Sequence, residues 1–271
     1  MSARIGSVDP LIGLLDLPGV AEAIDVARGA VDELLWNREV GRRKEELRAE
    51  SAVRGAWASA WFEGAETGLA QLRTGAALDE SPVGRLLANA LALHIELPVL
   101  VGVVGTAPNQ ALARMHALAA HGFADESELG RPRTIETADD ALRIGALPGA
   151  EQVGERMGGL SRLLVSSTSP GLLVAAVAHA EVAALRPFGW GSGLVARALI
   201  RLVLAQRGVD PEFLVAPEVG LRSVGRPAYV RAVRGYAEGT PEGVAAMLRL
   251  VAGAVERGAR EPVTWLDDGP A

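Results

Sequence analysis

The chain has 271 residues, enough for a large hydrophobic core in one or two domains. Hydrophobic residues make up 49% of it but aromatic residues only 4%, which predicts a core of alanine, leucine and valine and favours packed helices. The net charge of -6 disfavours a general nucleic-acid surface, and the absence of cysteine excludes disulfides and thiolate metal sites.

Two apolar runs, Leu86–Ala107 and Ser166–Leu185, approach the length of a membrane span. Each carries ionisable residues, among them Glu96 and Glu181, which are costly near the centre of a bilayer. We therefore expect buried helices and no membrane partner. The segment Met1–Val20 lacks a basic region followed by an apolar core, so we expect a cytoplasmic protein without a signal peptide.

Residues 1–28 show a mixed pattern, and residues 30–74 show a helical one. The run 37–50 alternates positive and negative charges, which is typical of a solvated helix. Asp79-Glu80-Ser81-Pro82 is a turn and helix-start signal.

The next segment leaves two interpretations open. Leu86–Leu97 reads as a helix that Pro98 ends, and the valine-rich run Val99–Val104 reads as a short strand before a helix over Asn109–His121. Strand, glycine and helix form half of a dinucleotide-binding pattern, so a nucleotide-cofactor oxidoreductase is one alternative. The G-x-G-x-x-G fingerprint is absent, and strands and helices do not alternate elsewhere.

A polar stretch over residues 122–149 contains two segments, Thr134–Thr137 and Leu142–Ile144, that are predicted to pair as a small hairpin. Four further helices are predicted after it, over the ranges Glu151–Val165, Pro170–Leu185, Val195–Gln206 and Pro241–Glu256. A loop with three glycines lies between the second and third of them. Free N–H groups at a helix start can bind anions, so the candidate nucleotide- or anion-binding residues are Gly191, Ser192, Gly193 and Arg197.

The sequence from Arg186 to Arg197, RPFGWGSGLVAR, resembles the loop motif of the Fic (Fido) family, H-P-F-x-[DE]-G-N-G-R-x-x-R. Residues 112–118, 130–133, 148–160 and Tyr229 also occupy family-like positions, so the resemblance spans about residues 50–250. It implies an all-α helical bundle with a small β-hairpin flap over the active site, and transfer of AMP from ATP to a protein hydroxyl. It divides the chain into an N-terminal helical region (1–80) with an inhibitory-like helix, a Fic-like core (81–207) and a C-terminal helical region (208–271).

A second motif lies before the loop. Ser59, Glu63 and Gly64 match the family's inhibitory pattern [ST]-x-x-x-E-[GN]. Ser59 and Glu63 are four residues apart and so share one face of a helix. The resemblance implies that Glu63 pairs with Arg197, the second arginine of the loop motif.

The sequence departs from the family pattern at the positions that carry out the family's chemistry. Arg186 occupies the position of the catalytic histidine, and a permanently protonated guanidinium cannot act as a general base. Trp190 replaces the acidic magnesium ligand, Leu194 replaces a phosphate-binding arginine, and Ser192 replaces the asparagine. Loss of a general base alone typically lowers a rate by about two to four orders of magnitude. The sequence therefore predicts a protein without ordinary AMP transfer.

The first hypothesis is a binding or regulatory module with a protein partner. The alternative is a divergent nucleotidyltransferase, autoinhibited by its N-terminal helix, in which Arg186 and Arg197 clamp a phosphate substrate. The resemblance implies ATP and magnesium as cofactors, and Trp190 and Leu194 disfavour them. We also expect Trp190 and the Glu63–Arg197 pair to help close the former ATP site.

The four histidines point to no metal site. His94 and His121 have no partners at metal-ligand spacing, and His116 and His179 read as buried, hydrogen-bonded helix residues. No nucleic-acid partner is expected, and the sequence does not predict the oligomeric state.

Overall fold

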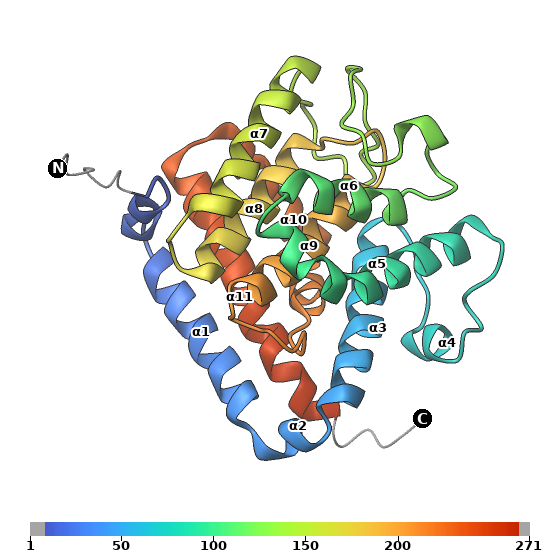
Figure 1. The fold of residues 1–271 in the computed structure, drawn as a ribbon, viewed down its shortest axis with the longest axis vertical. Coiled ribbons are helices and arrows are strands. Elements are labelled where there is room, and N and C mark those ends of the chain that lie inside the picture. The colour runs from blue at the N-terminus through green and yellow to red at the C-terminus, as the bar shows by residue number, and fades with distance from the viewer. Residues whose placement is uncertain (1–8, 266–271) are drawn as a thin grey trace.

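Two helices form the centre of the molecule, α8 (Gly171–Leu185) and α9 (Ser192–Gln206). In the computed structural model, which describes residues 9–265, 13 of the 15 residues in each of these helices are buried. A helix that is buried on every side needs other helices around it. Figure 1 shows α8 and α9 inside a ring of longer helices. The glycine-rich loop joins this central pair, so the fold holds the loop between two fixed helix ends.

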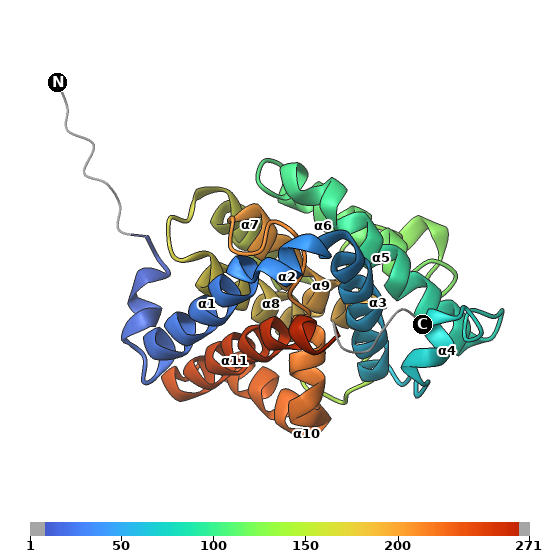
Figure 2. The same cartoon turned by 90° about the horizontal axis from the view of Figure 1, so that it is seen from below.

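The surrounding helices come from both ends of the chain. Helix α11 packs against α10 and also runs along α1, far from it in sequence (Figure 2). Helix α3 packs against α5 and α10, and α6 packs against α5. Their bounds are η1 Ile12–Asp16, α1 Val20–Trp36, α2 Arg38–Arg42, α3 Lys44–Phe62, α4 Leu69–Arg73, α5 Pro82–Val104, α6 Pro108–Ala119, η2 Glu126–Glu128, α7 Ala150–Ser166, α10 Pro217–Glu238 and α11 Pro241–Trp265.

Side-chain caps explain two of the helix starts. The Asn37 side-chain oxygen accepts the N–H groups of Glu39 and Val40 at 2.9 and 3.2 Å and so begins α2. The Ser81 hydroxyl accepts the N–H of Gly84 at 3.0 Å and begins α5, with Pro82 in the first turn. The predicted helix start at residues 79–82 is confirmed.

The predicted helix stop at Pro98 and the strand over Val99–Val104 are wrong. Helix α5 continues through Pro98 to Val104. The buried residues Leu93, Leu97 and Leu100 are spaced by four and three positions, so they share one face of the helix on both sides of the proline. Their burial against α3, α6 and α9 outweighs the lost backbone hydrogen bond, which typically costs about 3 kcal/mol. The oxidoreductase alternative depended on this strand and falls with it.

The predicted hairpin is also wrong. Residues 9–265 contain no strand, and residues 131–149 form an irregular segment, called here the flap segment. Side chains form hydrogen bonds with backbone groups that would otherwise pair between the two strands of a hairpin. The Asp140 carboxylate accepts the N–H groups of Ile144 and Gly145 at 2.7 and 3.0 Å. Arginine side chains, such as Arg234 at 2.7 Å from the Ile144 carbonyl, take carbonyl oxygens of the same segment.

Helix α10 was not predicted. Its sequence contains Gly225 and Pro227, and a glycine and a proline this close together are typical of a loop. Gly225 adopts φ 79° and ψ 158°, a backbone conformation that favours glycine, and kinks the helix there. Packing against α11 holds the two halves in place.

A buried polar cluster joins α3, α5, α9 and α10. Arg201 on α9 donates to the Ser51 carbonyl and hydroxyl at 2.9 and 3.0 Å, and to the Phe213 carbonyl at 2.9 Å. Glu218 lies 3.7 Å from Arg201 and 3.1 Å from His94 Nε2. The hydrogen bond from His94 and the charge of Arg201 lower the pKa of Glu218 despite its burial. The cluster fixes α3 against α9 one turn from the candidate site.

Among the described residues one helix, α5, is long and apolar enough to cross a membrane, judged by length and composition alone. It lies against α3, α6 and α9.

Candidate functional site

The loop between α8 and α9 is closed at both ends by unusual backbone conformations. Arg186 ends α8 with φ 45°, and Gly191 begins α9 with φ 75°. Inside the loop, the Ser192 hydroxyl accepts the N–H of Phe188 at 3.0 Å and lies 3.2 Å from the Phe188 carbonyl. Ser192 therefore holds the loop in a tight turn.

His116 on α6 contacts the loop through a hydrogen bond and a ring stack. Its Nδ1 accepts the N–H of Gly130 at 2.9 Å, so its Nε2 carries the proton and donates to the Trp190 carbonyl at 3.1 Å. The ring stacks on Phe188 with centroids 4.0 Å apart. Burial lowers the pKa of His116 to about 4. His116 is the buried, hydrogen-bonded residue that the sequence predicted.

Arg186 holds the flap segment. Its Nη1 lies 3.0 Å from the Asp140 carboxylate, and its Nη2 donates to the Gly145 carbonyl at 3.0 Å and to the Ala146 carbonyl. Burial lowers the pKa of Arg186, and the charge of Asp140 opposes that shift. Both terminal nitrogens of the guanidinium are thus bonded to residues of the flap segment.

Backbone hydrogen bonds make the same connection. The Asp139 N–H donates to the Gly189 carbonyl at 2.7 Å, and the Arg133 N–H donates to the Pro187 carbonyl at 2.8 Å. The Arg133 side chain adds a bond from Nε to the Arg186 carbonyl at 2.9 Å. The flap segment is therefore fixed on the loop along its length.

Arg197 is fully buried between α9 and α3. Its Nε donates to the Ser59 hydroxyl at 2.9 Å, and its Nη2 donates to the Ser59 carbonyl at 3.1 Å and to the Glu63 carboxylate. The guanidinium lies 4.9 Å from the centre of the Phe62 ring. Its Nη1 is buried without a hydrogen-bond partner. Gly64 directly follows this contact, with φ 100°.

Gly193 is the point of closest approach between the loop and the Glu63–Arg197 pair. A Cβ atom built there would lie 3.0 Å from Arg197 Nη1 and closer still to the Glu63 carboxylate. A larger residue at position 193 would therefore have to displace the ends of the Glu63 and Arg197 side chains from their present contact.

These residues surround a cavity of about 30 Å³, to which Glu63, Gly191, Ser192, Gly193, Arg186, Arg197, Tyr229 and the flap residues Asp139 and Asp140 contribute. Ligand pockets usually measure roughly 300–1,000 Å³, so this one has space for about a single water molecule. Its lining includes three carboxyl groups and two guanidinium groups. Burial, followed by the negative charge of Glu63, raises the pKa of Asp139. The cavity is closed to a nucleotide and offers no excess of positive charge.

Six of the predicted residues lie around one cavity: Glu63, Arg186, Gly191, Ser192, Gly193 and Arg197. Ser59 reaches this group through its hydrogen bond with Arg197. The sequence singled out neither Asp139 nor Asp140 as a site residue. The only local signal was their place in the polar stretch.

Trp190 does not line the cavity. Its ring stacks on Phe123 with centroids 4.2 Å apart, and its backbone carbonyl faces His116. Phe123 gives the indole an aromatic partner outside this cavity, and a role of Trp190 in closing the former ATP site stays a prediction.

The donor set at the loop does not fit magnesium. An indole offers no oxygen ligand in place of the acidic side chain. Leu194 at the start of α9 is fully buried and offers no polar group. No group of three His, Asp or Glu side chains within residues 9–265 is arranged to hold a metal ion.

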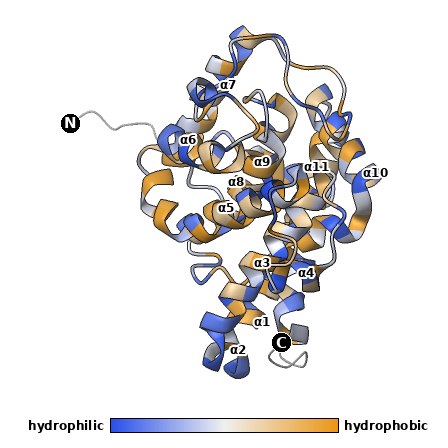
Figure 3. Ribbon diagram, turned by 90° about the vertical axis from the view of Figure 1, so that its right-hand side faces the viewer, coloured by the Kyte–Doolittle hydropathy of each residue, from blue (hydrophilic) through white to orange (hydrophobic). Residues whose placement is uncertain are grey.

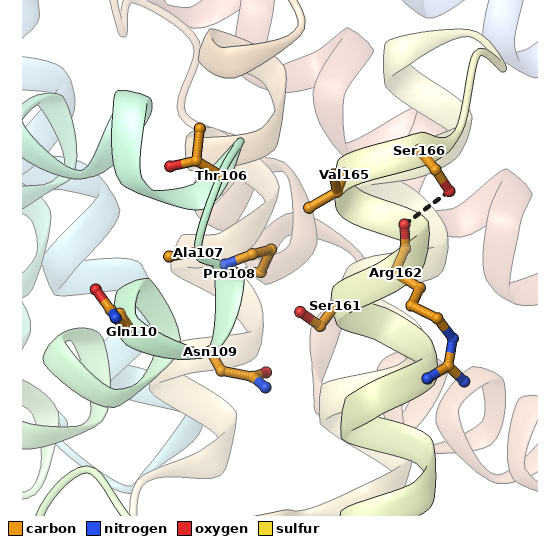
Figure 4. Close-up of a pocket in the computed structure, with 9 residues that line it drawn as sticks. All are labelled: Thr106, Ala107, Pro108, Asn109, Gln110, Ser161, Arg162, Val165 and Ser166. Atoms are coloured by element: carbon orange, nitrogen blue, oxygen red, sulfur yellow. Dashed lines mark hydrogen bonds between the residues drawn. The ribbon is translucent and has the colours of Figure 1, made fainter.

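Other pockets are larger than this cavity, and one of about 280 Å³ has Phe188 of the loop in its lining. One of about 510 Å³ is open to solvent between the start of α6 and the end of α7, where Arg162 is the one charged lining residue (Figure 4). The Arg162 side chain in Figure 4 points away from Asn109 and Gln110 across the pocket. We see no convergent polar groups there.

Comparison with known proteins gives matches in structure only. No family model and no curated protein matches the chain. A Fic family protein from Desulfovibrio desulfuricans G20 superposes with a TM-score of 0.72 at 19% identity, over 94% of this chain and 76% of the other. Residues 134–508 of Fic-1 from C. elegans give 0.69 at 20% identity, over 93% and 74%. A Fic domain containing signaling protein from Bacteroides thetaiotaomicron VPI-5482 gives 0.61 at 12% identity, over 92% and 99%.

The chain has the Fic fold. The all-α class predicted from sequence is confirmed, without the hairpin. The three-region division of the chain stays a prediction.

The Ser59 contact with Arg197 gives a testable stability effect within this Fic fold. We expect Ser59→Ala to lower the free energy of unfolding by about 1.5–3 kcal/mol, because a buried guanidinium Nε loses its partner. Urea denaturation measures the change. Ser166→Ala is the matched control, since that hydroxyl bonds the Arg162 carbonyl at an exposed position and its loss should cost less than about 0.5 kcal/mol. Equal effects of the two substitutions would contradict the assignment.

His179 predicts acid sensitivity. It is fully buried, its Nδ1 donates to the Ala196 carbonyl at 2.8 Å, and its Nε2 lies 3.2 Å from the Tyr229 hydroxyl. Burial lowers its pKa from 6.5 to about 4. Between these values the unfolded chain binds the proton and the folded chain does not, so stability falls as the pH falls from about 6.5 towards 4.

The expected loss from this one group is about 2 kcal/mol at pH 5. Urea denaturation at neutral pH and at pH 5 should show it, and His179→Gln should reduce the difference between the two conditions. An unchanged difference in that variant would show that His179 is not responsible.

Proposed function

We propose that this Fic-fold protein does not transfer AMP and acts as a binding or regulatory module for a protein partner. The observation that carries the proposal is the place of Arg186. The side chain in the catalytic histidine position is a permanent cation whose donors are directed to Asp140 and to two carbonyl groups of the flap segment. It neither accepts a proton nor leaves the flap free to receive a substrate.

The charges of the cavity support the same proposal. Three carboxyl groups against two guanidinium groups would repel a triphosphate. Glu63 is bound to Arg197, the pairing that the family resemblance implies, and this pairing takes up one of the candidate anion-binding residues. The expectation of a protein partner rests on the same resemblance, since family members act on protein hydroxyls.

One observation favours the alternative, a divergent phosphate-substrate transferase. Arg197 Nη1 is buried, has no hydrogen-bond partner and lies beside the start of α9. Helix starts carry free N–H groups, so removal of Glu63 would leave a guanidinium and a helix start facing one space. Arg186 contributes less to such a site than the sequence suggested, because the flap segment already engages it.

The two functions separate in one experiment. The purified protein and its Glu63→Gly variant are incubated with labelled ATP and a protein mixture, and binding of ATP and pyrophosphate is measured by calorimetry. We expect no labelled protein from either form and no heat of binding from the wild type. Labelled self-modification or labelled targets would overturn the proposal.

Glu66→Gly is the matched control, since Glu66 is an exposed glutamate that pairs with Arg226 and does not touch the cavity. Binding of pyrophosphate by Glu63→Gly but not by Glu66→Gly, without transfer, would show that the cavity keeps an anion site that Glu63 blocks. Transfer by Glu63→Gly would favour the enzyme.

A further inference from the structure

Two tryptophans and two arginines stack where the end of α3 meets α10. The Arg222 guanidinium carbon lies 3.4 Å from the centre of the Trp57 ring and 5.1 Å from that of Trp61. The Arg226 guanidinium carbon lies 4.1 Å from the centre of the Trp61 ring. All four side chains are half-buried, and Figure 3 shows α10 at the right-hand edge of the molecule with α3 and α4 below and to its left. We call these four residues the Trp–Arg patch.

The positive charges of the patch are not balanced. Arg226 Nη1 lies 3.3 Å from the Glu66 carboxylate, and its Nη2 donates to the Trp61 carbonyl. Among the buried and half-buried arginines of residues 9–265, Arg222 alone has neither a hydrogen bond nor an ion pair, and its Nη1 is buried without a partner. Burial, followed by the charge of Arg226, lowers the pKa of Arg222. The fold therefore keeps a half-buried cation for which it supplies no counter-ion.

The excess of positive charge continues along α3. Arg54 lies three residues before Trp57, on the same face of the helix. It shares the Glu50 carboxylate with Arg73. With the two arginines and the one glutamate described above, four guanidinium groups meet two carboxylates on this side of a chain whose net charge is -6. A local field of this sign attracts anionic groups.

The stacked geometry favours carboxylates over nucleic acid. A guanidinium that lies on an aromatic ring keeps its N–H groups at the edge, where they can donate to a carboxylate in the same plane. Arg222 Nε and Nη2 reach solvent and have no partner among the described residues. Bases of a nucleic acid need free ring faces on which to stack, and the guanidinium groups already cover a face of each indole. Tryptophan and arginine also contribute most to the affinity of protein interfaces.

We propose that the Trp–Arg patch binds an acidic segment of the protein partner, with one carboxylate held by Arg222 and a second beside Arg226. This inference rests on the proposed function, which requires a protein partner, and it adds the chemistry of that partner. The indoles hold the two guanidinium groups in place before binding, so less side-chain freedom is lost when the carboxylates arrive. The Glu66 side chain is 74% exposed, so its pair with Arg226 is weak and can be replaced by a carboxylate of the partner.

Fluorescence anisotropy on the full chain tests the binding, with a labelled peptide of alternating glutamate and alanine as the probe. We expect saturable binding that weakens as salt is added, because charged groups at a half-exposed site make the contact. Arg222→Gln should raise the dissociation constant at least about tenfold, because a carboxylate loses its charge-assisted hydrogen bonds. Arg222 makes no hydrogen bond within the described residues, so the variant should remain folded, which circular dichroism checks.

Arg231→Gln is the matched control, since Arg231 is an exposed arginine of the same helix outside the patch, and it should bind the peptide as the wild type does. A peptide with lysine in place of glutamate should not bind. Equal dissociation constants for Arg222→Gln and Arg231→Gln would overturn the proposal, as would the absence of saturable binding by the wild type. Tighter binding of a labelled oligouridine than of the acidic peptide would overturn it and assign the patch to nucleic acid.

The chain itself offers another source of carboxylates. Asp267 and Asp268, which lie outside the described residues, follow Trp265 in the sequence, and the Trp265 ring centre is 4.6 Å from the Arg54 guanidinium carbon. Peptide binding by the double variant Asp267→Asn with Asp268→Asn, but not by the wild type, would overturn the proposal and assign the patch to the chain's own carboxylates.

These readouts are separate from the test of the proposed function, because none of them involves ATP. Failure to bind the acidic peptide would remove this inference and leave the outcome of the AMP-transfer experiment unaffected. Labelled transfer by the wild type would overturn the proposed function even where the peptide binds.

Discussion

Returning the loop to the full Fic pattern is expected to produce transfer of labelled AMP to protein. The variant combines Arg186→His, Trp190→Asp, Ser192→Asn and Leu194→Arg with Glu63→Gly. Its histidine has a pKa near neutrality and can act as the general base, and the new aspartate and arginine provide an oxygen ligand and a phosphate cation. Glu63→Gly frees Arg197 and removes the carboxylate that fills the cavity beside Gly193.

The matched control carries glutamine in place of the histidine and is otherwise identical. We expect the histidine form to be faster by about two to four orders of magnitude, the typical contribution of a general base. Circular dichroism and urea denaturation must show that both forms are folded, because Leu194 is fully buried and an arginine there is destabilising. Equal rates in the two forms would contradict the assignment of position 186 to the base. Activity in Glu63→Gly alone would contradict the proposed function.

The largest loss of stability is expected at Arg201. Arg201→Leu should lower the free energy of unfolding by about 3–5 kcal/mol, because it removes the guanidinium beside the buried Glu218 carboxylate and three hydrogen bonds to Ser51 and Phe213. Urea denaturation at neutral pH measures the change. Arg231→Leu on α10 is the control, since Arg231 is exposed, and its effect should be within about 0.5 kcal/mol.

The double variant Arg201→Leu with Glu218→Leu should be more stable than Arg201→Leu alone. Removing both charges leaves no uncompensated carboxylate, and apolar replacements of buried ion pairs are often neutral. If the double variant is instead less stable by the sum of the two single effects, Arg201 and Glu218 do not act as a pair.

Local patterns predicted the central part of the fold. The long apolar runs of α8 and α9, with glycines between them, identify two buried helices around a tight loop, and the structure places them there. The spacing of Ser59 and Glu63 placed both on one helix face, and both contact Arg197. In these cases the residues that decide the structure are close together in sequence.

Other features depend on contacts between distant segments. Pro98 ended the predicted helix because the sequence does not show that α3, α6 and α9 cover α5 on three sides. The hairpin failed because Arg186 and Arg234, far along the chain, take the carbonyl groups of residues 143–146. The role of Asp140 could not be predicted, since a single aspartate in a polar stretch carries no sign of its partner.

The manner in which the flap segment is held has a consequence for its evolution. Arg186, Arg133 and Arg234 hold it by carbonyl oxygens of Ile135, Ile144, Gly145 and Pro148, which every amino acid supplies. Side chains on this segment can therefore be exchanged while the anchoring bonds remain, provided that Arg133 and Asp140 are kept. The segment is a surface on which new recognition sequences can accumulate, or be grafted, without disturbing the helices beneath it.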